Sequence, residues 1–236
     1  TQGNKIYVDG VPLFPGVGAN TTASGTLAAM VQLRDGYASE FQLQLDEVAR
    51  GLISAFSETD PSNPANVLAG LFVEIGVAGV PPDGAVSVGL AGRIGLNALA
   101  DPDQGGNSML LRDGVNFNYN ASGFGSFNER LLAYTDRIDA PSNFINSSGV
   151  SASQSLSAYS TAAIGWLEDA RKTAAGAAEA KSALAIRSAE SLSNLTSVNV
   201  DEEMALMLEL EHSYSASAKM LQVVDEMLRT LLAAVR

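Results

Sequence analysis

The sequence is poor in the residue types on which most protein chemistry depends. Its 236 residues include no cysteine and only one histidine, His212. Without cysteine, disulfides and thiolate metal sites are excluded. With one histidine, the commonest general acid and base is almost missing. We therefore expect no metal, no cofactor and no enzymatic activity.

Cationic residues and long apolar runs are also scarce. Fourteen Lys and Arg oppose 26 Asp and Glu, which gives a formal net charge of -12. Such a chain repels phosphate backbones and anionic lipids, so we expect neither nucleic acid nor membrane as a partner. No apolar run approaches the roughly 20 residues that span a bilayer. The N-terminus, TQGNKIYVDG, has no signal-peptide pattern and no initiator Met, which indicates a processed protein or a piece of a longer one.

What the chain does have is enough apolar content, 46%, to bury a core. Residues 1–23 read as the end of an upstream β domain and a linker, because Ile6 to Val8 precede the turn Asp9-Gly10. Residues 24–66 read as a long helix of an inner rod-like domain with its exit loop. The helix is predicted from about Thr26 to Phe56, and two prolines within residues 59–66 predict the loop. The helical spacing rests on Leu27, Val31, Ala38, Phe41, Leu45, Val48, Leu52 and Ala55.

The middle of the chain differs in composition from the segment that follows it. Residues 67–145 are rich in glycine and predict a β and loop region with a short helix near Phe127 to Asp136. Residues 146–196 are rich in Ala and Ser, and predict a long helix of the rod-like domain from about Ser151 to Ser193. The fold class expected is mainly α, with long axial helices in a bundle or coiled coil and a smaller β or irregular part.

The last region, residues 197–236, predicts an axial helix. Asn199 and Asp201 are candidate N-caps, and Glu202 and Glu203 place negative charge in the first turn, where the helix dipole favours it. Apolar residues recur in heptad register along two neighbouring rows, with Ser217 as the one polar member. The predicted packing seam consists of Met207, Leu210, Tyr214, Leu221, Val224, Leu228, Leu231 and Val235.

Two places could hold chemistry, and each also has an ordinary structural interpretation. The run from Asp101 to Gly106 could begin a calcium loop, but Arg112 stands where that loop needs Glu, which favours a plain turn. His212 has no evident Ser or Asp partner and is interpreted as a helix-surface or interface residue. The seam itself could belong to the core of its own domain, or to a helix lying on a membrane, although its polar side is acidic.

Three stretches of the sequence resemble bacterial flagellar axial proteins. The C-terminal stretch runs from Val198-Asn199-Val200-Asp201-Glu202-Glu203-Met204 through Tyr214 to Lys219 and Asp225 to Leu232. The second runs from Ser24-Gly25-Thr26-Leu27 through Leu33-Arg34-Asp35, and the third from Gly92-Arg93-Ile94 through residues 101–106 to residues 110–114. The last two make the chain similar to the hook-associated group of these proteins.

The resemblance implies a structural subunit at the junction of hook and filament, built by helical self-assembly. Implied partners are other copies, the hook protein, the next hook-associated protein and an export chaperone. The implied location is the extracellular flagellum, reached through the flagellar secretion system without a cleaved signal. It also implies that N- and C-terminal helices pair in inner layers, and the N-terminal partner is missing from this chain.

Other functions remain open at this point. Another axial protein of hook or distal rod type shares the C-terminal resemblance. A secreted helical adhesin would need an exposed binding surface that the sequence does not identify. An enzyme would need paired carboxylates in the central region, with Asp101, Asp103, Glu129 and Asp136 as the candidates.

Overall fold

The computed structural model describes residues 4–12, 25–85, 87–146, 149–196 and 199–234. The chain divides into two compact units, Thr1–Ala174 and Ala175–Arg236. Long helices dominate, and the named strands form two-stranded antiparallel pairs. The predicted fold class, mainly α with a smaller β part, is confirmed.

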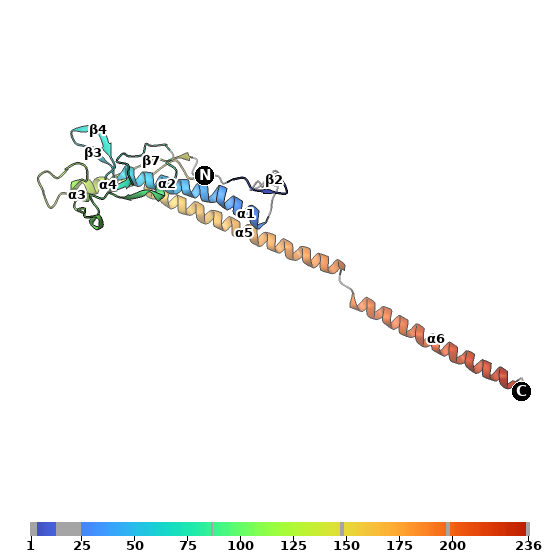
Figure 1. Cartoon of the computed structure of the whole chain (residues 1–236). Coiled ribbons are helices and arrows are strands. Elements are labelled where there is room, and N and C mark those ends of the chain that lie inside the picture. The colour runs from blue at the N-terminus through green and yellow to red at the C-terminus, as the bar shows by residue number, and fades with distance from the viewer. Residues whose placement is uncertain (1–3, 13–24, 86, 147–148, 197–198, 235–236) are drawn as a thin grey trace. The chain divides into compact units, whose positions relative to one another are not determined.

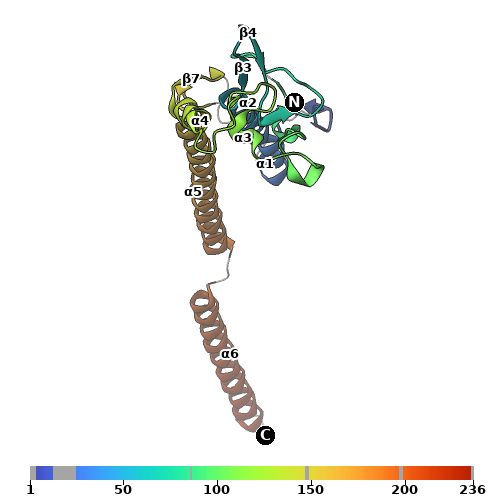
Figure 2. The same ribbon diagram turned by 90° about the vertical axis from the view of Figure 1, so that its left-hand side faces the viewer.

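The first unit is built around one long helical segment. It consists of α1 (Thr26–Gln32), the π-helical turn η1 (Leu33–Tyr37) and α2 (Ala38–Ala55), which follow one another without a break. In Figures 1 and 2 this segment lies within the unit, and β3, β4, α3 and α4 gather near the end of α2. Helix α2 is therefore covered on more than one side.

Burial along this segment differs from the sequence expectation. Val31 and Ala55 are buried as predicted, but Leu27 and Leu45 of the same expected face are exposed. Instead α2 buries four polar residues, Gln44, Asp46, Glu47 and Arg50. For three of these the reason is that neighbouring loops need hydrogen-bond partners that apolar residues cannot supply: Asp46 and Glu47 accept loop N–H groups, and Arg50 donates to a loop carbonyl.

Short antiparallel strand pairs complete the first unit. β1 (Tyr7–Val8) and β2 (Val11–Pro12) pair through Asp9 and Gly10, whose φ angles of 50° and 79° fit the two-residue turn that Asp-Gly favours. β5 (Phe72–Glu74) pairs with β6 (Ile94–Leu96), and β7 (Ser142–Asn143) pairs with β8 (Ser153–Gln154). Residues 13–23 of the expected linker lie outside the described residues.

The predicted exit loop at residues 59–66 is wrong. This segment forms a hairpin of β3 (Glu58–Asp60) and β4 (Asn63–Leu68). Pro61 lies in its turn, where Asp60 Oδ1 accepts the Ser62 N–H at 2.8 Å, and exposed Pro64 lies in a strand with only one partner. Proline ends a helix, but it is tolerated in turns and edge strands, so two prolines did not exclude a hairpin.

The glycine-rich centre is held by turns and by buried side chains. It contains η2 (Leu90–Gly92), η3 (Pro102–Gln104) and α3 (Leu110–Asp113) before α4 (Glu129–Asp139), the predicted short helix. Asp46 of α2 accepts the N–H groups of Gly89 at 2.7 Å and Ala91 at 2.8 Å. A buried carboxylate on a helix thus accepts backbone N–H groups that have no partner in a sheet.

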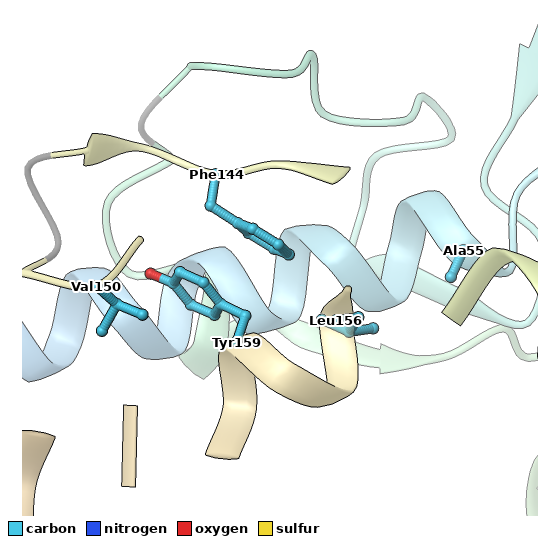
Figure 3. Packing of buried hydrophobic residues seen from close by; sticks show 5 residues of the cluster. All are labelled: Ala55, Phe144, Val150, Leu156 and Tyr159. Atoms are coloured by element: carbon cyan, nitrogen blue, oxygen red, sulfur yellow. The ribbon is translucent and has the colours of Figure 1, made fainter. Parts of the chain in front are cut away.

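Two apolar clusters flank α2. One contains Ala49 and Ile53 of α2 with Ala69 and Leu90. The other contains Ala55 of α2 with Phe144, Val150, Leu156 and Tyr159, which Figure 3 shows converging on α2. The rings of Phe144 and Tyr159 stack with centroids 4.0 Å apart.

Helix α5 (Leu156–Thr196) joins the two units. It begins five residues later than Ser151, because Ser153 and Gln154 are used in β8 and Ser155 Oγ then accepts the Ala158 N–H at 3.2 Å as an N-cap. Its first turns pack on α2 so closely that a Cβ on Gly51 would lie 2.6 Å from Leu156 Cδ1. The contact of Tyr37 with Trp166 shows that α5 runs antiparallel to the first long segment.

The second unit contains the end of α5 and α6 (Val200–Ala234). Asn199 is the N-cap, as predicted, since its Oδ1 accepts the Asp201 N–H at 3.2 Å. All described residues of this unit are exposed. The division into domains by function, with an inner rod-like part and a separate axial helix, stays a prediction.

Candidate functional site

The predicted seam lies entirely on α6 and is uncovered. Its seven described members range from 50% exposed at Val224 to 80% exposed at Tyr214. The eighth, Val235, lies outside the described residues. Soluble proteins do not usually leave a row of large apolar side chains in water, so this face is typical of a helix that is covered by another chain or segment.

The apolar face is wider than the sequence analysis indicated. Leu206, Met220 and Met227, each at least 61% exposed, belong to a third row of the same seven-residue repeat, in which Ser213 is the polar member. This row lies beside the other two on an α-helix. The signal was present in the sequence, but the interpretation considered only two heptad rows. A face three rows wide fits a groove or two partner helices better than a single narrow seam.

The opposite side of α6 is polar. Glu226, Lys219 and His212 recur there at seven-residue spacing, and Asp225 pairs with Arg229 at 3.1 Å. None of the hydrogen bonds found among the described residues involves the His212 imidazole. Its position agrees with an ordinary helix-surface residue.

The acidic first turn of α6 also has a structural role. Asp201, Glu202 and Glu203 are exposed and lie in the first turn, after Val200. Their negative charges lie where the helix dipole is positive, which stabilises the end of the helix.

The end of α5 in the same unit carries a second set of exposed apolar residues. Leu184, Ile186, Leu192 and Leu195 are 57% to 83% exposed, among many alanines. Small residues permit close approach of another helix, and the large ones supply area to bury. This surface and the apolar face of α6 together make the second unit a candidate assembly region.

The structure does not bring the candidate catalytic carboxylates together. Asp101 Oδ1 accepts the Asp103 N–H at 3.0 Å and its Oδ2 accepts Gln104 Nε2 at 2.9 Å, so it caps the turn η3. Glu129 and Asp136 lie on α4 two turns apart, a separation of about 10 Å along the axis. Within the described ranges, no group of three His, Asp or Glu side chains could hold a metal ion.

The buried charges that the structure does bring together come from residues the sequence analysis passed over. Glu58, fully buried, accepts the N–H groups of Val115 and Asn116 at 2.6 Å and of Phe117 at 3.2 Å. Arg130 Nη2 donates to its Oε1 at 2.9 Å. Every oxygen of Glu58 is therefore engaged in holding a loop and α4, which makes this carboxylate structural.

A second buried cation joins three segments in a similar way. Arg50, 2% exposed, pairs with Glu47 at 3.1 Å and with Asp83, and donates to the Asn143 carbonyl at 2.7 Å. Glu47 also accepts the Ile145 N–H at 3.1 Å. Glu47 and Arg50 lie three residues apart on α2, but sequence alone could not reveal their other partners, which lie 33 to 98 residues away.

Taken together, the exposed apolar helix and the structural use of the buried charges are typical of proteins that assemble through helix packing. Residues 194–234 match the family model described as flagellar basal body rod FlgEFG protein C-terminal. The match covers α6 and the last residues of α5. Comparisons with curated proteins and with solved structures found no match.

This match covers residues 194–234 and supports a flagellar axial, structural role for that segment. It places the matched segment on the same helix as the exposed apolar face. It does not separate hook-associated proteins from rod and hook proteins. Within the described part of the chain, no helix has the length and apolar character needed to cross a membrane.

Proposed function

We propose that this chain is a hook-associated protein 1 of the bacterial flagellum, which joins hook to filament by helical self-assembly. The observation that carries the proposal is the apolar face of α6, which lies within the segment matching flagellar axial proteins. The resemblance of residues 24–35 and 92–114 to the hook-associated group supports the narrower assignment.

In this proposal the two units have different tasks. Helices α1, α2 and α5 form the inner rod-like part, residues 67–145 form an outer part, and α6 packs into the axis. The partners are other copies, the hook protein and the next hook-associated protein. The chain is exported through the flagellar secretion system, with a chaperone bound, and acts outside the cell.

A rod or hook protein is the second candidate, and one observation favours it. The description of the matching family model names the rod and hook proteins FlgEFG and not hook-associated proteins. Deleting the gene separates the two candidates under the electron microscope. Loss of a junction protein leaves hooks without filaments, whereas loss of a rod or hook protein leaves no complete hook.

The assembly role of α6 is tested by changing Leu228 to Asp. Leu228 is 56% exposed in the free chain, so we expect the melting temperature of the isolated protein to change little. In an assembled contact the new carboxylate would be buried without a partner, which costs several kcal/mol. Cells should export the variant but shed flagellin into the medium instead of holding filaments.

The matched control is Gln222→Asp, which adds the same charge on the polar side of α6. We expect this variant to hold filaments as the wild type does. The proposal is wrong if Leu228→Asp lowers the melting temperature by several degrees and leaves filaments in place, because the seam would then serve an internal core.

A further inference from the structure

The long helical segment of the first unit contains a π-helical turn, η1, at Leu33–Tyr37. The Ala38 N–H donates to the Leu33 carbonyl, five residues earlier, where an α-helix would use the residue four earlier. Such a turn holds one residue more than an α-helical turn in the same place. Gly36 lies inside it, exposed, with open space where a Cβ would be. Because glycine is a poor helix former, η1 is a place where the helix geometry can change.

The apolar spacing of the sequence runs through η1 without a break. Between Leu27 and Ala55 the positions alternate in steps of four and three residues, which is the a and d spacing of a heptad. The members are Leu27, Val31, Arg34, Ala38, Phe41, Leu45, Val48, Leu52 and Ala55, with Arg34 as the polar one. A continuous α-helix would place all nine along one stripe.

In the structure, η1 puts the two halves of this stripe out of phase. Val31, Ala38 and Leu45 belong to one heptad row, yet Val31 is 4% exposed while Ala38 and Leu45 are exposed. One extra residue in the turn accounts for the difference, because successive residues of an α-helix lie about 100° apart around its axis. The sequence spacing and the structure therefore correspond to two different registers of α1 relative to α2.

The burial of Val31 explains which register the free chain adopts. Val31 and Ala28 are the buried residues of α1. In an unbroken α-helix, Val31 would turn about 100° away from its present side and join the stripe of Phe41 and Leu45. Leaving a buried site costs free energy unless another apolar surface covers the side chain in its new place. A heptad stripe is the surface that another helix covers by knobs-into-holes packing.

We propose that η1 is a register switch. When a helix with a heptad seam covers the stripe, η1 becomes α-helical and α1 rotates by about 100° about its axis. The partner helix favours this state because only the α register presents Leu27 and Val31 in one seam with Phe41 and Leu45, so its affinity differs between the two registers. The use of the switch in assembly rests on the proposed function, whereas the rotation itself does not.

The rotation can be forced in the purified full chain. Val31→Asp makes burial of this side chain unfavourable, so it should favour the register that turns position 31 outwards. The chain has no cysteine, so spin labels at two introduced cysteines, Ala29→Cys on α1 and Asp169→Cys on α5, report the rotation. A side chain at a radius of about 5–6 Å moves by about 8 Å in this rotation. We expect a narrow distance distribution shifted by up to about 8 Å.

Deletion of Gly36 is the matched control for the rotation. It removes the extra residue, so α1 can keep its present place on α2 as part of a continuous α-helix. Combined with Val31→Asp, the deletion should broaden the label distances instead of shifting them, because no change of register remains. Gly36→Ala keeps the residue count and should leave the shift intact. An unchanged or merely broadened distribution in Val31→Asp alone would overturn the switch.

Cells test whether assembly uses the switch. With Gly36 deleted, Leu27 and Val31 cannot align with the row of Leu45, so we expect export of the chain but at least tenfold fewer hooks that hold filaments. The isolated variant should melt at or above the wild-type temperature, and Gly36→Ala should hold filaments normally. Normal filaments in the deletion strain would overturn the assembly role. A melting temperature several degrees lower would also overturn it, because the extra residue would then serve the fold itself.

Failure of the proposed function gives a different pattern of results. In that case the chain is missing from purified flagella, and both the Gly36 deletion and Leu228→Asp leave filaments unaffected. The label shift in Val31→Asp would remain, because it is measured in the purified chain.

Discussion

Glu58 offers the sharpest test of how the first unit is stabilised. Its carboxylate is fully buried and accepts three backbone N–H groups and the Arg130 guanidinium. The change Glu58→Gln keeps the shape but removes the charge and replaces one acceptor oxygen by an NH₂ group. That NH₂ group would face N–H donors, and Arg130 would lose its ion pair.

The expected magnitude follows from these contacts. Removing one partner of a buried ion pair typically costs about 3–5 kcal/mol, because the other charge stays buried. A hydrogen bond to a charged group contributes roughly 1.5–3 kcal/mol, so the lost backbone contacts point to the same range. We therefore expect Glu58→Gln to lower the free energy of unfolding by about 3–5 kcal/mol.

Urea unfolding followed through tryptophan fluorescence measures this change in the full chain. Trp166 is the single tryptophan, and it lies in the first unit near Tyr37. The control is Glu168→Gln, whose partner Arg171 is 78% exposed, and an exposed pair of this kind contributes at most about 1 kcal/mol. If the free energy of unfolding of Glu58→Gln lies within about 1 kcal/mol of the wild-type value, the buried Glu58 carboxylate does not stabilise the first unit in the way argued.

Two further predictions concern backbone fit and pH. Gly114 has φ +107°, and an added Cβ would lie 1.9 Å from the Phe117 carbonyl oxygen, so Gly114→Ala should destabilise the chain by more than about 2 kcal/mol, while Gly125→Ala, at an open position, should not. Burial raises the pKa of Glu40, because the ionised carboxylate is less stable in the folded state than in water. Ionisation of Glu40 therefore destabilises the folded state. Wild-type stability should therefore fall as pH rises from the ordinary glutamate pKa through the raised one, and Glu40→Gln should be more stable above that window and equal below it. Urea titrations at a series of pH values would measure this difference, and a constant difference at all pH values would contradict the assignment to Glu40.

The sequence predicted the features that depend on local chemistry. The helix of the second unit begins at the predicted cap, and the Asp9-Gly10 turn has the expected backbone, because caps and turns involve residues close in the chain. The long helices were predicted for the same reason, since their periodicity is visible in a short window.

Long-range polar contacts could not be predicted from the sequence. Asp46 and Glu47 are not part of the apolar spacing that predicted the helix, yet both are buried and bind the backbone of distant segments. The distant partners are N–H groups, which every residue except proline carries, so no side-chain pattern marks them. The same holds for Glu58, which lies between the predicted helix end at Phe56 and the predicted loop at residues 59–66.

In the candidate assembly site, the sequence predicted the residues but not their environment. Its residues were predicted individually because heptad spacing is local, but their exposure could not be predicted, since the same pattern fits a helix buried in its own domain. Exposure is the observation that distinguishes these two interpretations. It is also what the match to flagellar axial proteins cannot supply, because a match concerns residue types and not their environment.

The contrast between the two units has a thermodynamic consequence for α6. In the first unit the buried charges of Glu58, Arg50 and Arg130 are each paired with an opposite charge of the same unit. In the second unit every described residue is exposed, and α6 is held by local hydrogen bonds, its N-cap and pairs such as Asp225 with Arg229. Isolated helices are marginal in water even when their propensity is high, since tertiary packing supplies most helical stability in proteins. In the proposed function, assembly covers the apolar face of α6 and therefore stabilises this helix by mass action.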